Sequence, residues 1–163
     1  MFLKNASEKV LSVNHGDLLN RAFQRKLSLA NALRIQTADM DTMMDLDNPV
    51  IKLCIEGTQA EFQGRIDEAR ALYQQAWEAS LDDFDACVSA HYLARHQNDP
   101  VKRLHWNQVA LDKADTIADE RVKDFYPSLY LNMGQSYELL GNPDEAKRYY
   151  DLAANLGAVH QVD

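Results

Sequence analysis

The chain has 163 residues, of which 46% are hydrophobic, and a formal net charge of −8. A chain of this length can bury the core of one domain without a disulfide or a metal, and no apolar run approaches the roughly 20 residues that a membrane span needs. Its charged start lacks a signal-peptide pattern, so we expect a cytoplasmic protein that does not enter a membrane.

The negative charge is concentrated in one part of the chain. Residues 1–49 carry six bases and six acids, which leaves 11 of the 17 bases and 19 of the 25 acids for residues 50–163. Phosphate backbones and anionic lipids are bound through Lys and Arg, so this balance argues against nucleic-acid and membrane partners. The two cysteines, Cys54 and Cys87, are expected to be reduced thiols.

Residues 1–49 are interpreted as an N-terminal extension that precedes the main domain at residues 50–163. The stretch "DLLNRAFQRKLSLANALRI" places four apolar residues near helical spacing: Leu19, Phe23, Ala30 and Leu33. This pattern predicts a helix over residues 17–35. We expect the helix to cap the first unit of the domain, with a degenerate repeat over residues 17–46 as the alternative.

Two stretches of the main domain repeat each other 77 residues apart. "GRIDEARALYQQAWEA" occupies residues 64–79, and "GNPDEAKRYYDLAA" occupies residues 141–154. The same offset pairs Gly57 with Gly134, so the repeated unit is a helix, a glycine-bearing turn and a second helix. The offset equals two periods of 34 residues plus a nine-residue insertion, which predicts another unit between the two.

The predicted middle unit is degenerate. A shift of 34 residues places His91 in the slot of Gly57, and Asn107 in the slot that tyrosine fills in the other units. Asn107 would either hydrogen-bond inside the array or mark a site. Asp99 followed by proline predicts a helix start. The insertion lies in "DKADTIADERVKDFYP" and is expected to lengthen one or both flanking helices. Pro127 would be tolerated near a helix start but would kink a helix that began as early as Asp119.

These residues resemble the tetratricopeptide repeat (TPR), a 34-residue helix-turn-helix unit. Small or aromatic residues stand where the motif wants them in the first and third units: Gly57, Gly64, Ala69, Tyr73 and Ala76, then Tyr130, Gly134, Tyr137, Gly141, Ala146, Tyr150 and Ala153. The resemblance covers about residues 50–157. It implies an all-α fold, a TPR-like α-solenoid of three helix-turn-helix repeats with an N-terminal capping helix.

The resemblance also implies a non-catalytic scaffold or adaptor that binds a peptide or protein segment in a concave groove. Such a groove is lined mainly by the first helix of each unit, and helical spacing combined with the repeat offsets selects one face of these helices. The candidate peptide-binding residues are Thr58, Glu61, Ser89, Tyr92, Arg95, His96, Leu131, Asn132, Gln135 and Glu138. Tyr92 would be the aromatic anchor. The alternative is a solvated face without a ligand.

Several more specific functions are disfavoured. A TPR subgroup grips the acidic tails of chaperones with lysine, asparagine and arginine, whereas the corresponding places here hold Cys54, Thr58, Ser89, Ser128 and Asn132. Cys87 and His91 lie four residues apart but on a packing face, without a third catalytic group, so we expect no enzyme. The histidines lack zinc-ligand spacing and no glycine-rich phosphate loop occurs, so no metal or cofactor is expected.

The C-terminal end of the array supplies the alternative function. Only "NLGAVHQVD" follows Ala154, so Leu156 and Val159 would lie on an uncapped flank. Such an end could make the chain a homo-oligomeric structural or regulatory protein, for example a homodimer. Trp77 and Trp106 lie in predicted second helices with apolar neighbours, so we interpret Trp77 as a core residue rather than as a base-stacking platform.

Overall fold

The computed structural model describes residues 47–117 and 120–158. The chain divides into two units, Met1–Gln36 and Thr37–Asp163, and all described residues lie in the second. The helix or degenerate repeat expected within residues 17–46 therefore lies outside the described residues.

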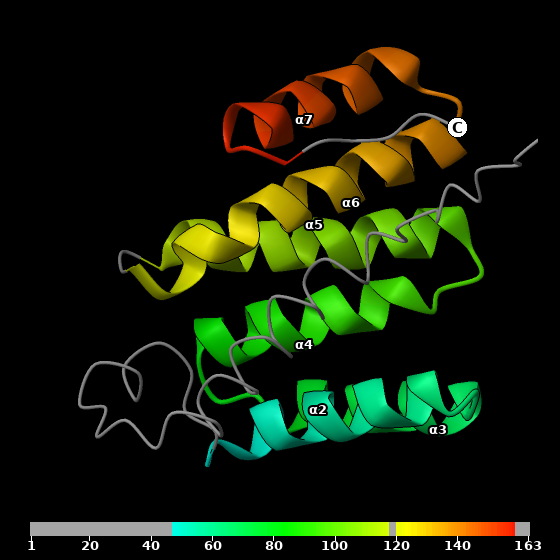
Figure 1. Cartoon of the computed structure of the whole chain (residues 1–163), viewed down its shortest axis with the longest axis vertical. Helices are drawn as coiled ribbons and strands as arrows, with labels where there is room; N and C mark the ends of the chain where they lie inside the picture. Colours follow the sequence, from blue (N-terminus) through cyan, green and yellow to red (C-terminus); the bar gives the residue numbers. More distant parts are fainter. Residues whose placement is uncertain (1–46, 118–119, 159–163) are drawn as a thin grey trace, which may run out of the picture. The chain divides into compact units, whose positions relative to one another are not determined.

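The described part of the chain is helical and contains no strand, as the sequence predicts. The described residues form six α-helices, and each helix lies beside its neighbours in the sequence (Figure 1). Their bounds are α2 (Pro49–Phe62), α3 (Ile66–Glu78), α4 (Asp83–Arg95), α5 (Pro100–Thr116), α6 (Tyr126–Leu139) and α7 (Pro143–Asn155). Among these described helices, none is long and apolar enough to cross a membrane.

Four of the helices begin at side chains that accept hydrogen bonds from the first helical turn. Asn48, Asp82, Asp99 and Asn142 bond backbone N–H groups at the starts of α2, α4, α5 and α7. In α2, α5 and α7 a proline follows the capping residue. Proline is tolerated there because the N–H at the first helical position has no acceptor within the helix. The helix start predicted at Asp99 is confirmed.

Equivalent glycines end α2 and α6. Gly64 and Gly141 adopt φ angles of +74° and +73°, which are unstrained in glycine. In both turns the N–H of the next residue donates to a carbonyl of the last helical turn at 2.9 Å. The two turns are thus built in the same way, as the 77-residue repeat predicts.

The helices pack as three consecutive pairs. α2 packs on α3, α4 on α5 and α6 on α7, and the second helix of each pair contacts the first helix of the next. One core of buried residues connects the three pairs and includes Ile51, Cys87, Ala110, Met133 and Tyr149. This is the arrangement expected for helix-turn-helix units that bury their faces against one another.

A glycine beneath a tyrosine ring sets the close approach of the two helices in the first and third units. A Cβ atom on Gly57 would lie 2.8 Å from Tyr73 Cδ1, and one on Gly134 would lie 2.5 Å from Tyr150 Cδ1. Any larger residue would therefore clash with the ring. The small and aromatic positions of the repeat are explained by this contact.

In the middle unit the sizes of the two slots are reversed. His91 occupies the glycine slot on α4 and Asn107 the tyrosine slot on α5, and both are buried. Asn107 Nδ2 donates to Ser136 Oγ at 2.8 Å and to the carbonyl of Asn132 at 3.3 Å. Of the two roles considered for Asn107, hydrogen bonding inside the array is the one observed.

The nine-residue insertion forms a connection as well as a longer helix. α5 has 17 residues against 13 in α3 and α7, so part of the insertion lengthens α5 as predicted. Another part forms a 3-10 helix, Glu120–Phe125, which the sequence did not indicate. Buried Val122 holds this segment against the core. α6 starts at Tyr126, so Pro127 lies in the first turn, where proline is tolerated, and does not kink the helix.

Candidate functional site

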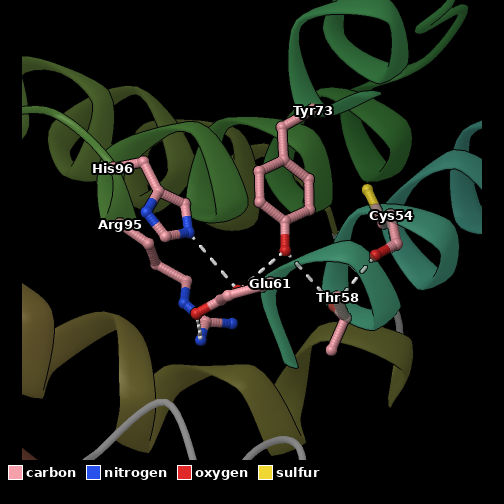
Figure 2. A network of polar contacts seen from close by, with 6 residues as sticks. All are labelled: Cys54, Thr58, Glu61, Tyr73, Arg95 and His96. Atoms are coloured by element: carbon pink, nitrogen blue, oxygen red, sulfur yellow. Dashed lines mark hydrogen bonds and ion pairs between the residues drawn. The ribbon is translucent and has the colours of Figure 1, made fainter. Parts of the chain in front are cut away.

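Polar side chains from α2, α3 and α4 converge on the carboxylate of Glu61 (Figure 2). The Tyr73 hydroxyl donates to Glu61 Oε2 at 3.0 Å, and Arg95 Nη2 donates to Oε1 at 2.7 Å. His96 Nε2 lies 3.4 Å from Oε2. Because Arg95 follows Glu61 by one 34-residue period, the ion pair links the same position of two successive units.

Thr58 closes this network on the side of α2. Its hydroxyl donates to the carbonyl of Cys54 at 2.9 Å, and its Oγ1 lies 3.4 Å from the Tyr73 hydroxyl oxygen. Both side chains are buried, and Tyr73 has no exposed surface. Thr58 therefore positions Tyr73 and is not accessible to a ligand.

Stacked rings extend the network along α4. The Tyr73 ring stacks on Tyr92 with a centroid distance of 5.1 Å and on His96 at 5.9 Å. The Arg95 guanidinium lies over the Tyr92 ring, 5.6 Å from its centroid. Tyr92 is thus half-buried and fixed between Tyr73 and Arg95 before any ligand binds.

The charges of this cluster compensate one another. Burial disfavours the ionised form of Glu61, but the contacts with His96, Arg95 and Tyr73 outweigh it and lower its pKa. Burial raises the pKa of Tyr92 to about 12. At neutral pH the cluster therefore holds an ionised Glu61 and neutral tyrosines. The side chains of Glu61 and Arg95 are 22% and 18% exposed, so both reach the surface.

The other predicted groove residues lie on α4 and α6. Asn132 Nδ2 is 3.3 Å from His91 Nδ1, so this side chain connects the two helices. Gln135 is half-buried, and Glu138 is exposed and accepts a 2.6 Å hydrogen bond from Tyr150. Glu138 and Tyr150 thereby repeat the pair that Glu61 and Tyr73 form in the first unit.

Three of the predicted groove residues are buried. Thr58 belongs to the network above, Ser89 is bonded to the carbonyl of Asp85 at 2.8 Å, and Leu131 is 3% exposed. The remaining seven have accessible surface: Glu61, Tyr92, Arg95, His96, Asn132, Gln135 and Glu138. These seven define what we call the first-helix face.

Cys87 and His91 do not have the protonation states of a thiol nucleophile and its base. Burial, and to a smaller extent the charge of Asp115, raises the pKa of the Cys87 thiol to about 12. Burial, and to a smaller extent the charge of Arg95, lowers the pKa of His91 to about 3. Both groups are neutral at physiological pH, whereas a reactive cysteine requires a thiolate. Cys54 and Cys87 are both buried free thiols.

The two tryptophans contact each other across the first and second units. Trp77 and Trp106 make an edge-to-face contact with a centroid distance of 4.9 Å. Both are partly buried and pack against the core. This position agrees with the prediction that Trp77 is a core residue.

Sequence reasoning missed two features of the site. It treated Glu61 and Arg95 as separate groove residues, although opposite charges one repeat period apart were the signal for an inter-unit ion pair. It also did not assign Tyr73 a polar role. That role could have been recognised from the recurrence of the same Glu and Tyr spacing in the third unit.

The fold and the site together define a helical repeat protein, and comparison with known families identifies the repeat. Residues 127–156, which span nearly all of α6 and α7, match the tetratricopeptide repeat model. The match confirms the resemblance and supports assignment to the TPR family, whose repeats generally serve as protein–protein interaction scaffolds. No curated protein and no solved structure matches the chain.

Proposed function

We propose that the chain is a non-catalytic adaptor that binds a peptide or protein segment on the first-helix face. The observation that carries the proposal is the fixed position of Tyr92 and Arg95. The Tyr92 ring stacks on Tyr73, and the Arg95 guanidinium pairs with Glu61. Part of the Tyr92 and Arg95 side chains stays accessible. Aromatic and arginine side chains that are already ordered lose little entropy on binding, and they dominate many protein interfaces.

The neighbouring residues on α6 support the same proposal. Asn132, Gln135 and Glu138 add amide and carboxylate groups, which can fix the orientation and register of a bound segment. We further propose that the site works in the cytoplasm and that the N-terminal extension caps the first unit.

The test compares two matched substitutions of exposed or half-exposed glutamine. Partners captured from lysate by the intact protein are purified, and their affinity is measured for Gln135→Ala and for Gln59→Ala, which alters an exposed side chain of α2. We expect Gln135→Ala to weaken binding at least about fivefold. Gln59→Ala should have little effect. Equal affinity for all variants would contradict the proposal.

A second candidate function is self-association through the α6–α7 end. Leu156 is 52% exposed, whereas Ala79 at the same position of the first unit is half-buried against the core. The other predicted residue of this end, Val159, lies outside the described residues. Sedimentation of the wild type and of Leu156→Glu tests this candidate, since a homodimer through this end would dissociate in the variant.

A further inference from the structure

A cleft of about 530 Å³ opens between α3, the C-terminal end of α4 and the first turn of α5. Its floor includes Tyr73 and Leu93, both buried, and the half-buried ring of His96. Its rim includes Arg70 on α3 and Lys102 on α5. The volume lies in the range of about 300–1,000 Å³ that is common for ligand sites.

The charge of the cleft is opposite to that of the rest of the domain. Arg70 and Lys102 bring two cations to the rim, although residues 50–163 carry 19 acids and 11 bases. The one carboxylate in the lining, Asp99, is occupied as the N-cap of α5, where it accepts from the Val101 N–H at 2.9 Å. The rim thus offers cations to a ligand and keeps its carboxylate engaged.

The rim also has unused hydrogen-bond donors. Within the described part of the chain, the Lys102 ammonium makes neither an ion pair nor a hydrogen bond. Arg70 is held in place by Asp67 at 3.1 Å and by Asn98 Oδ1 at 3.3 Å. Because Asn98 accepts through its oxygen, its amide N–H₂ group can donate to a ligand.

We propose that this cleft binds an acidic peptide segment of a partner protein. The carboxylates of the segment pair with Lys102 and Arg70, and its apolar or aliphatic groups rest on the accessible side chain of Ala71 and on the half-buried ring of His96. The accessible apolar surface of Ala71 and the His96 ring favours a peptide over a simple anion, which gains nothing from apolar contact. The site lies beside α3 and shares one residue, His96, with the first-helix face, while Lys102 and Arg70 lie outside that face, so it does not depend on the function proposed above.

The third unit supplies a matched control for the test. Lys147 stands 77 residues after Arg70, at the equivalent position of α7, and forms a 2.6 Å ion pair with Asp151 on the surface. A charge reversal at Lys147 changes the net charge as much as one at Lys102 does. It leaves the cleft between α3 and α5 unchanged.

The experiment measures binding of a fluorescent peptide, acetyl-Glu-Leu-Asp-Phe-Glu-amide, to the full-length chain by anisotropy. A peptide with lysine in place of each acidic residue, inorganic phosphate and acetate serve as comparison ligands. The variants are Lys102→Glu, Arg70→Glu and Lys147→Glu, each checked for helix content by circular dichroism. Amide shifts of Ala71, Gln74 and Asn98 in NMR spectra report where the peptide binds.

We expect the acidic peptide to bind and the lysine peptide not to bind. Lys102→Glu and Arg70→Glu should weaken binding at least about tenfold, and Lys147→Glu less than about twofold. Three results would overturn the proposal: no binding by the wild type, equal losses in all three variants, or displacement of the peptide by phosphate or acetate at equal concentration. If Arg70→Glu loses helix content, Lys102→Glu, which alters an exposed residue, still decides.

Discussion

The first and third units place the same three side chains at the same positions, yet in different surroundings. Gly57, Tyr73 and Glu61 recur 77 residues later as Gly134, Tyr150 and Glu138. In the first unit α4 covers the tyrosine, so that Tyr73 has no exposed surface, and Arg95 pairs with the glutamate. In the third unit Tyr150 is only partly buried and its glutamate is exposed.

The difference shows how a repeat position gains structural importance from its neighbour. The tyrosine–glutamate hydrogen bond forms in both units, so it is a property of the unit itself. The ion pair with Arg95 and the rings stacked on Tyr73 come from the second unit. Stability in such arrays is the sum of unit terms and interface terms, and here the two can be separated by paired substitutions.

The largest expected effect comes from removing each tyrosine. Tyr73→Ala should lower the free energy of unfolding by about 4 kcal/mol, because it empties a fully buried site between three helices. Tyr150→Ala should cost about half as much, since its ring is partly exposed. Equilibrium urea unfolding measures both. Equal losses would show that the covering helix contributes nothing at this position.

The glycines beneath these rings should give the next largest difference. Gly57→Ala should cost about 2 kcal/mol, because the added Cβ meets a buried ring that packs against Tyr92 and His96. At Gly134 the Tyr150 ring is only partly buried, and alanine gains about 1 kcal/mol of helix propensity. We therefore expect Gly134→Ala to change stability by less than about 1 kcal/mol in urea unfolding. A larger loss at Gly134 than at Gly57 would contradict this interpretation.

The two glutamates should differ in their dependence on pH. Glu61→Gln should cost about 1–3 kcal/mol at neutral pH, because Arg95 and Tyr73 lose a charged acceptor. The folded-state pKa of Glu61 lies below its ordinary value of 4.5. Its contribution is therefore complete above pH 4.5 and is lost as the pH falls through the lowered folded-state pKa.

Thermal unfolding at several pH values tests this expectation. The gap between wild type and Glu61→Gln should narrow below pH 4.5, the ordinary value of the carboxyl. Glu138→Gln should cost less than about 1 kcal/mol at any pH, because Glu138 is exposed. A gap for Glu61→Gln that does not change with pH would contradict the ionised state assigned to Glu61.

The smallest effect is expected in the middle unit, which has no tyrosine in this slot. Asn107→Leu removes the hydrogen bonds to Ser136 and Asn132, but it also removes a buried Oδ1 that has no partner among the described residues. The two changes oppose each other, so the loss in urea unfolding should be below about 1 kcal/mol. A loss as large as that of Tyr73→Ala would show that the amide supports the whole junction.

The helix pairs could be predicted because their signals are local or periodic. The turn glycines, the capping residues and the glycine–tyrosine spacing all follow from backbone geometry and close packing. The 3-10 helix could not be predicted, because Val122 holds it through contacts with distant residues of the core. The domain boundary between residues 49 and 50 stays a prediction. So does the N-terminal helix expected to cap the first unit.

The candidate site was less accessible to sequence reasoning. Helical spacing and the repeat offsets select one face of the first helices, but they do not show which side chains on that face form hydrogen bonds with one another. Thr58 and Ser89 were assigned to the groove and instead bond the backbone of their own helices. The cleft beside α3 combines residues of three helices and the turn before α5, so no single spacing in the sequence indicates it.

The reversed slot of the middle unit restricts how this chain could be rebuilt. A copy of the first unit placed in the middle would bring a tyrosine ring to the position where Asn107 now donates to Ser136 and Asn132. The glycine opposite would remove His91 from its contact with Asn132. The units are therefore not interchangeable modules. An attempt to shuffle or extend the array would need to transfer α4, α5 and the facing surface of α6 together.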